Sequence, residues 1–388
     1  MKQNPSEPFD MLAKTFAGLE PALAQELKQI GASDIIIGRR MVSFKGNTEC
    51  MYKANVYLRT ALRVLKPIYK GIIKTPEDYY NFFHTLEWEK YMGLHHTFAI
   101  DAVINTKVFN NSLYAAQRAK DGIADRFKDK YNKRPNVDVQ QPEILINVHY
   151  SGEELSIALD SSGEPLNKRG YRVGEGEAPL NPVLAAAMII YSKWDPSTTF
   201  IDPMTGSGTL AIEAAMIARG IPPGLIRKTY SFQNWPDYNR QLFQQIIDNI
   251  ELSELRPQIF ASDILPEMIE IARKNAQKAL VSSYIRFSTQ SFDEYKTKAK
   301  AGTLIMNPPY GERLKPEEIN QLYSSIGTSL KREFQGYTAW IISSNLDAMK
   351  NIGLKPVAKY QLYNGGLQCN YAGFELFDGS LKEFKEKN

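Results

Sequence analysis

The turn Asn307-Pro308-Pro309-Tyr310 constrains the fold of this chain more than any other short segment. It follows an apolar run at residues 303–306 that predicts a buried strand. Because prolines lack an N–H donor and fix φ, two in succession force the chain out of the sheet in a rigid turn. Ligands of open α/β sheets bind at this carboxyl edge of the strands. The turn therefore predicts a ligand site, and a proline-rich surface turn is the alternative.

The side chains of this turn suit a planar base that carries an exocyclic amine. The amide oxygen of Asn307 and the carbonyl of Pro308 can accept hydrogen bonds from the amine, and Tyr310 can stack on the ring. Accepting both amine hydrogens would favour a pyramidal nitrogen whose lone pair points at an electrophile. We therefore predict a catalytic turn made of Asn307, Pro308, Pro309 and Tyr310.

Residues 198–218 form a second candidate site. A short strand with β-branched and aromatic residues ends at Asp202, a tight loop follows at 205–208, and the Ala-rich run after it has high helix propensity. The glycines of the loop would let the backbone approach a ligand at a helix N-terminus. Ala211 replaces the third glycine of a dinucleotide fingerprint, and no Lys-Ser or Lys-Thr pair follows as in a Walker loop. The cofactor-binding residues predicted here are Asp202, Thr205, Gly206, Ser207 and Gly208.

Asp263 ends the next strand, at 258–263, before a helix predicted over 266–280. Its carboxylate could accept from both ribose hydroxyls of a nucleoside-like cofactor, or it could be an acid near a helix N-terminus. Dinucleotide folds place this acid about 20 residues after the glycines, whereas Gly208 and Asp263 lie 55 residues apart. An insertion at 219–252 accounts for the spacing. Its Phe232 and Trp235 are further candidates for base stacking, with one of the two expected to pack in the core.

The strands of the C-terminal half are predicted to begin at residues 198, 258, 285, 303, 337 and 359. The last of them turns at Asn364-Gly365-Gly366, a strong hairpin signal, into a final strand. A helix over 319–334 should pack on one face of this sheet. After the strand at 285–289, Ser291 and Phe292 could contact the edge and face of an adenine, and an ordinary strand-exit turn is the alternative.

In this order the motifs resemble those of class I S-adenosylmethionine-dependent methyltransferases, in the branch that methylates amines. Further segments are similar to bacterial RNA methyltransferases that carry a THUMP domain. Within that group the chain resembles the type that methylates guanine N2 of large-subunit ribosomal RNA. Such chains are often labelled adenine-specific DNA methylases because of the Asn-Pro-Pro-Tyr motif. The further segments are 16–20, 26–27, 42–46, 160–163, 168–172, 178–182 and 362–369.

The resemblance implies an α/β fold, with a C-terminal Rossmann-like class I methyltransferase sheet and a closing antiparallel hairpin, preceded by α+β ferredoxin-like and THUMP domains. The implied domains are 1–65, 66–162 and 163–388. The implied cofactor is S-adenosylmethionine, and the implied partner is RNA, either large-subunit ribosomal RNA or a pre-ribosomal particle. Ser291 stands where such enzymes often carry Asp. Asn181, Ile264, Ser291, Phe292 and Asn307 complete the implied cofactor-binding residues.

Basic residues gather at 128–134 and at 168–172, and two more lie off the buried side of a helix predicted at 112–126. Phosphate contacts from Lys and Arg would position RNA without reading its sequence. An aromatic residue between cations suits stacking on unpaired bases. The cluster at 128–134 could instead be a solvated helix end. The predicted RNA-binding residues are Arg118, Lys120, Lys168, Arg169, Tyr171 and Arg172.

The composition limits the class of protein. A chain of 388 residues that is 43% hydrophobic can form two or three domains with cores of their own. Its net charge of +4 is mild, so nucleic-acid binding would have to come from local patches. The two cysteines, Cys50 and Cys369, favour a reducing compartment, and no His or Cys spacing suggests a metal site. With a polar start and no apolar run of about 18 residues, we predict a soluble cytoplasmic protein without membrane or metal partners.

These observations and the resemblance predict an enzyme that transfers a methyl group from S-adenosylmethionine to the exocyclic amine of an RNA base, guanine N2 in 23S ribosomal RNA. The sulfonium already makes the methyl electrophilic, so the protein must mainly align the amine, and no strong base is required. Two alternatives are a DNA adenine or cytosine amino-methyltransferase and a catalytically silent RNA-binding or ribosome-assembly protein. A nicotinamide-dependent oxidoreductase is disfavoured by the missing third glycine.

Overall fold

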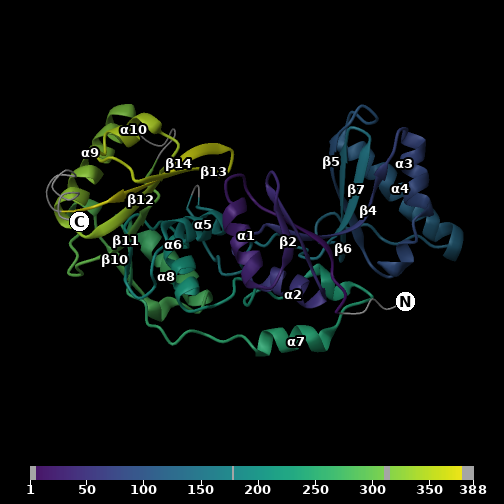
Figure 1. Cartoon of the computed structure of the whole chain (residues 1–388), viewed down its shortest axis with the longest axis horizontal. Coiled ribbons are helices and arrows are strands. Elements are labelled where there is room, and N and C mark those ends of the chain that lie inside the picture. The colour runs from purple at the N-terminus through teal and green to yellow at the C-terminus, as the bar shows by residue number, and fades with distance from the viewer. Residues whose placement is uncertain (1–5, 177–178, 310–314, 378–388) are drawn as a thin grey trace. The chain divides into compact units, whose positions relative to one another are not determined.

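The computed structural model describes residues 6–176, 179–309 and 315–377 of the chain (Figure 1). The chain divides into two compact units. The N-terminal unit consists of Met1–Thr15, Ala24–Lys168 and Arg227–Asn249, and the C-terminal unit consists of Phe16–Leu23, Arg169–Ile226 and Ile250–Asn388. Each unit is built around a seven-stranded sheet.

The sheet of the N-terminal unit contains β1 (Phe9–Lys14), β2 (Ser33–Ile37), β3 (Met41–Gly46), β4 (Arg63–Ile72), β5 (Phe98–Asn105), β6 (Ile144–Ser151) and β7 (Glu154–Asp160). Their order is β2-β3-β1-β4-β7-β6-β5, in which β5 and β6 are parallel and the other neighbours antiparallel. Since β4 pairs with β1 and with β7, one sheet runs through the regions predicted as ferredoxin-like and THUMP domains. The predicted boundary at 65/66 falls inside β4.

Helices α2 (Thr48–Tyr57), α3 (Pro76–Thr85) and α4 (Ser112–Tyr131) join strands of this sheet, and α7 (Arg240–Asp248) packs against α2. Helix α1 (Glu20–Gln29), which joins β1 and β2, is divided between the two units. α2 continues to Tyr57, and β4 begins only at Arg63. Leu113 is 66% exposed in the first turn of α4, beside the N-cap Asn111.

The insertion after the glycine loop packs within the N-terminal unit. Residues Arg227–Asn249 belong to that unit, where Phe232 stacks on Tyr52 at 4.4 Å between ring centroids. The backbone N–H of Asn239 donates to the Tyr52 hydroxyl at 3.0 Å. Phe232 and Trp235 are both buried. Their proposed base-stacking role is therefore corrected to core packing for both residues, since buried rings present no face to a nucleotide.

The sheet of the C-terminal unit contains β8 (Thr199–Asp202), β9 (Ile259–Asp263), β10 (Ile285–Thr289), β11 (Gly302–Met306), β12 (Tyr337–Ser343), β13 (Ala358–Asn364) and β14 (Leu367–Glu375). Their order is β10-β9-β8-β11-β12-β14-β13. The first five are parallel, and β14 runs antiparallel to both of its neighbours. The predicted mostly parallel sheet with a closing antiparallel hairpin is confirmed. Its order reverses between β8 and β11, which is where open α/β sheets bind ligands.

Five helices pack on this sheet within the described residues: α5 (Pro182–Ser192), α6 (Thr209–Ala218), α8 (Pro266–Lys278), α9 (Pro316–Glu333) and α10 (Leu346–Lys350). Proline begins α5, α8 and α9, where its missing N–H costs no helical hydrogen bond. α9 buries Ile319, Tyr323, Ile326 and Leu330 against Leu304 and Met306 of β11. This packing holds α9 beside the carboxyl edge of the central strands.

Replacing Gly327 with alanine tests how closely α9 packs on the chain that follows α10. Alanine normally favours a helix over glycine by about 1 kcal/mol. Here a Cβ would lie 2.0 Å from the carbonyl oxygen of Ile352, so backbone must move, and overpacking costs about 1–3 kcal/mol or more. We expect a lower free energy of unfolding for Gly327→Ala in urea titrations. The exposed neighbour Thr328→Ala is the control, and equal stability of the two variants would contradict this packing.

Candidate functional site

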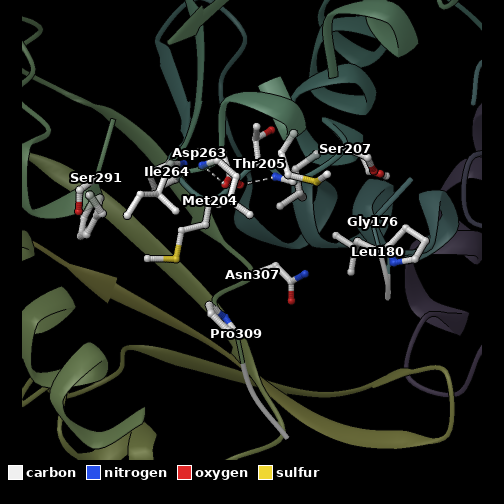
Figure 2. A pocket seen from close by; sticks show the side chains of 18 of the residues that line it. Gly176, Leu180, Met204, Thr205, Ser207, Asp263, Ile264, Ser291, Asn307 and Pro309 are labelled. Atoms are coloured by element: carbon white, nitrogen blue, oxygen red, sulfur yellow. Dashed lines mark hydrogen bonds between the residues drawn. The ribbon is translucent and has the colours of Figure 1, made fainter. Parts of the chain in front are cut away.

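A cleft of about 670 Å³ opens at the carboxyl edge of the C-terminal sheet (Figure 2). Its walls come from the loops that follow β8, β9, β10 and β11, from one side of α9 and from residues near 175–180. In Figure 2, Ser291 lies toward one end of the cleft and Gly176 and Leu180 toward the other, with Asn307 between them. The cleft therefore occupies the reversal point of the strand order, and its volume is in the range of small-molecule sites.

The glycine loop between β8 and α6 forms one wall of the cleft. Gly206 and Gly208 have φ values of +50° and +86°, which favour glycine. A Cβ at Gly208 would lie 2.9 Å from the Cβ of Ala272 in α8, so only glycine allows this approach. Thr205, Gly206 and Ser207 line the cleft, whereas Gly208 lies behind them against α8.

Asp263, at the end of β9, lies beside this loop. Its Oδ2 accepts the backbone N–H of Gly206 at 2.8 Å, and its Oδ1 accepts that of Leu265 at 3.1 Å. A carboxylate has about four acceptor positions, so further hydrogen bonds from a ligand remain available. Ile264 lines the cleft next to Asp263 and is 66% exposed. This pair offers a polar acceptor and an apolar surface at one point of the wall.

Asp202 lies under the loop and is fully buried. Its Oδ2 accepts the hydroxyl of Thr205 at 2.6 Å. Burial raises the pKa of Asp202 to about 7, and the negative charge of Asp263 adds to this shift. Asp202 is not among the residues that line the cleft, and neither is Asn181, whose side chain caps α5 by accepting the N–H of Val183. Both residues shape the site from behind its walls.

The turn after β11 places Asn307 and Pro309 on the cleft wall (Figure 2). Pro308 is buried between them. The Oδ1 atom of Asn307 is buried and has no hydrogen-bond partner among the described residues. A buried acceptor without a partner is costly, so it favours a ligand that brings an N–H or O–H donor. Tyr310 lies outside the described residues.

The loop after β10 brings the predicted residues Ser291 and Phe292 to the cleft, together with Gln290 and Asp293, which the sequence did not single out. Phe292 lines the cleft but is largely buried, and it stacks on Phe334 at 5.5 Å. Asp293 also lines the cleft, and its Oδ1 accepts from the hydroxyl of Ser325 on α9. The lining residues that sequence reasoning missed are Glu175, Gly176, Pro179, Leu180, Pro203, Met204, Thr209, Leu210, Leu265, Met268, Gln290, Asp293, Leu322 and Ile326.

The basic segment at 168–172 differs from its prediction. Arg169 and Tyr171 are buried, and both donate to Oε1 of the buried Glu213 on α6, at 3.3 and 3.1 Å. Arg172 donates to the carbonyl of Leu180 and, at 3.2 Å, to the hydroxyl of Thr209. The prediction that Arg169 and Tyr171 contact RNA is therefore corrected, because their polar groups are directed into the core by a buried carboxylate.

Among the other predicted RNA-binding residues, Lys168 is exposed, and Arg118, Lys120 and Arg172 are partly exposed. Lys168 pairs with Glu164 at 3.0 Å and Lys120 with Asp121 at 2.6 Å. Arg118 lies over the ring of Tyr80 at 4.5 Å and near Glu77 at 3.8 Å. Exposed pairs of this kind contribute about 0–1 kcal/mol, so phosphates could replace the carboxylates at little cost.

Comparison with known proteins relates this site to a family. A family model described as the RMKL-like methyltransferase domain matches residues 169–372, more than half of the chain. The chain belongs to this methyltransferase family. Models of an RlmL ferredoxin-like domain and of a THUMP domain match residues 10–65 and 74–160. The predicted resemblance to THUMP-containing class I methyltransferases is thereby confirmed.

Individual relatives agree with this assignment. The ribosomal RNA large subunit methyltransferase K/L of Shewanella frigidimarina is 35% identical over 96% of this chain, which spans 54% of that relative. A Synechocystis protein named as a candidate RNA methyltransferase is 34% identical over 93% of this chain and 95% of its own. The solved structure of SMU.472, a candidate methyltransferase complexed with SAH, is 29% identical with a TM-score of 0.86, covering 96% of this chain and 100% of that one. The chain thus spans about half the length of the K/L relative.

Within the part of the chain that is described, no group of three or more His, Cys, Asp or Glu residues is arranged to hold a metal ion. Among the helices described, none has both the length and the apolar character that a membrane span needs.

Asp202→Asn tests the buried carboxyl under the glycine loop. A pKa raised to about 7 means that the folded state binds a proton more tightly than the unfolded chain. The stability that Asp202 contributes is therefore fully present below about pH 4 and is lost as the pH rises to about 7. Because one pKa unit corresponds to about 1.4 kcal/mol, the free energy of unfolding of the wild-type protein should fall by about 1–4 kcal/mol relative to that of Asp202→Asn over this range. Urea unfolding without cofactor measures the difference, and identical pH profiles would contradict it.

Proposed function

We propose that this protein transfers a methyl group from S-adenosylmethionine to the exocyclic amine of a base in RNA. The observation that carries the proposal is the Oδ1 atom of Asn307, a buried acceptor without a described partner on the wall of a cleft at the strand-order reversal. An exocyclic amine of a nucleobase donates hydrogen bonds and also carries a lone pair for methylation. The family membership supports methyl transfer as the reaction class.

The cleft suits S-adenosylmethionine, whose sulfonium supplies an electrophilic methyl group. Thr205, Gly206 and Ser207 line the cleft, and Asp263 would offer carboxylate oxygens to ribose hydroxyls. Ile264 and Phe292 provide apolar surface for a purine, and Ser291 provides a hydroxyl at its edge. The SAH complex of SMU.472, which shares the fold over nearly the whole chain, supports the same cofactor here. Asp202, Gly208 and Asn181 would support these walls without lining the cleft.

Catalysis would depend on alignment of the amine by the turn after β11. Asn307 Oδ1 would accept one amine hydrogen and the carbonyl of Pro308 the other, while the two prolines keep the turn rigid. Holding reactants in line can contribute about 7–11 kcal/mol. We propose no general base, because the amine proton can leave after methyl transfer.

The choice of RNA rests on the N-terminal unit and on the names of relatives. A THUMP match at residues 74–160 precedes the methyltransferase domain, and the relatives named K/L are large-subunit ribosomal RNA methyltransferases. We propose large-subunit ribosomal RNA, with guanine N2 as the target amine, and a three-part division at about 65/66 and 162/163. Arg118, Lys120, Lys168 and Arg172 are the remaining candidates for phosphate contacts.

The proposed function is tested by methyl transfer from labelled S-adenosylmethionine to total RNA and DNA from a strain that lacks the gene. Nucleoside analysis should find the label in N2-methylguanosine from large-subunit RNA. Label in methyladenine of DNA would contradict the RNA assignment and favour a DNA amino-methyltransferase. Intact cofactor binding without label in naked RNA should be followed by the same assay on pre-ribosomal particles. Loss of both binding and label would favour the silent ribosome-assembly protein.

Asn307→Ala should lower turnover about 100-fold, because displacing a reacting group by about 1 Å has an effect of that size. Cofactor affinity should fall much less, since the amine and not the cofactor depends on this acceptor. Asn345→Ala is the matched control, as Asn345 follows the neighbouring strand β12 and caps α10 without lining the cleft. Single-turnover rates and cofactor titration separate the two effects, and equal losses of turnover and affinity would contradict the assigned role.

A further inference from the structure

Asn275 of α8 is a buried amide whose hydrogen bonds join two separate segments of the C-terminal unit. Its Nδ2 donates to the carbonyl of Ser207 at 2.9 Å and to that of Gly174 at 3.0 Å. Its Oδ1 accepts the N–H of Val173 at 2.8 Å and that of Gly174 at 3.4 Å. All four contacts are to backbone, and Asn275 is 1% exposed. One carboxamide therefore fixes residues 173–174 relative to the glycine loop.

Both segments continue directly into walls of the cleft. Gly206 and Ser207 line it from the glycine loop, and Glu175 and Gly176 line it immediately after Gly174. Asn275 itself is not among the lining residues. It thus lies where a small displacement would move two walls of the cleft without changing any group that touches the ligand.

The packing of α8 leaves little freedom around Asn275. One turn earlier, Ala272 lies so close to Gly208 that a Cβ there would be only 2.9 Å from the alanine methyl. On the other segment, a Cβ at Gly174 would lie 3.3 Å from Ile271. Because α8 begins just after Asp263, this helix connects the acid at the end of β9 to both walls.

The segment that contains residues 173–174 has a second, independent anchor. Glu213 accepts from Arg169 and Tyr171, and Arg172 donates to Thr209, so α6 holds residues 169–172. Loss of Asn275 would therefore leave the segment attached at 169–172 but free to shift beyond residue 172. The expected consequence is a change of cleft shape and not unfolding of the whole segment.

We propose that Asn275 is a positioning residue that sets the separation of the two walls and thereby the affinity for the cofactor. The inference rests on the proposed function of the cleft as the S-adenosylmethionine site. Removing the carboxamide leaves backbone groups of Val173, Gly174 and Ser207 without their buried partner. These groups must then move toward water or toward each other, because buried polar groups without partners are costly.

Two variants and a control test the proposal, with SAH as the probe. Asn275→Ala removes all four hydrogen bonds, while Asn275→Asp keeps the acceptor for Val173 and turns an oxygen toward two carbonyls. Ile269→Val is the control: it shortens a buried side chain of the same helix and keeps every Asn275 contact. Calorimetry at a temperature well below unfolding should show SAH binding weakened about tenfold or more in both Asn275 variants. Ile269→Val should bind as the wild-type protein does, even if its melting temperature is lowered equally.

Hydrogen exchange of the wild-type protein gives a readout that needs no variant. The amides of Val173 and Gly174 should be protected without ligand, and SAH should slow exchange at 173–176 together with 206–208. If SAH slows exchange in the glycine loop alone, the inference that Asn275 links the two walls of the cleft is overturned. Equal SAH affinity of Asn275→Ala and the wild-type protein would overturn the positioning role but not the function. Failure of the wild-type protein to bind SAH would overturn both.

Discussion

The hydrogen bond from the backbone N–H of Gly206 to the carboxylate of Asp263, at 2.8 Å, joins the loops of two neighbouring parallel strands. It forms at the carboxyl edge of the sheet, next to the point where the strand order reverses. Gly206 has a left-handed φ in this loop, and the close approach of Gly208 to Ala272 holds the loop against α8. The cleft, its acid and the helix that carries Asn275 all depend on this junction.

A second constraint is the distribution of buried polar groups behind the cleft. Glu213, Asn275 and Asp202 are buried, and each bonds a segment that shapes the walls. Buried polar side chains are costly unless satisfied, so they specify one arrangement of the segments they join. The two amides differ: backbone groups satisfy both amide atoms of Asn275, whereas the Oδ1 of Asn307 has no partner among the described residues. The supporting amide is thus satisfied by the protein, and the amide on the cleft wall remains available to a ligand.

Much of the C-terminal sheet could be predicted from sequence because its signals are local. Short apolar strands, prolines at helix starts and the Asn-Gly-Gly turn each act within a few residues, and the hairpin formed as expected. The glycine loop was found from its glycines before an Ala-rich run, and the acids at the ends of β8 and β9 from their positions at strand ends. The lining residues from α9 were missed because their apolar periodicity indicates core packing, and Glu175 and Gly176 were missed because they belong to no motif. The roles of the individual site residues remain predictions.

The sequence by itself determined where the strands end, and hence that Asp202, Asp263 and Asn307 would gather at one edge of a parallel sheet. Only the tertiary structure decided which side chains would reach the cleft. Arg169, Tyr171, Phe232 and Trp235 carry the residue types of a nucleic-acid surface, yet all four are buried. The physical reason is non-local: Glu213 lies more than 40 residues from its partners and Tyr52 about 180 from Phe232. Contacts over such separations follow from the fold as a whole and leave no trace in short sequence patterns.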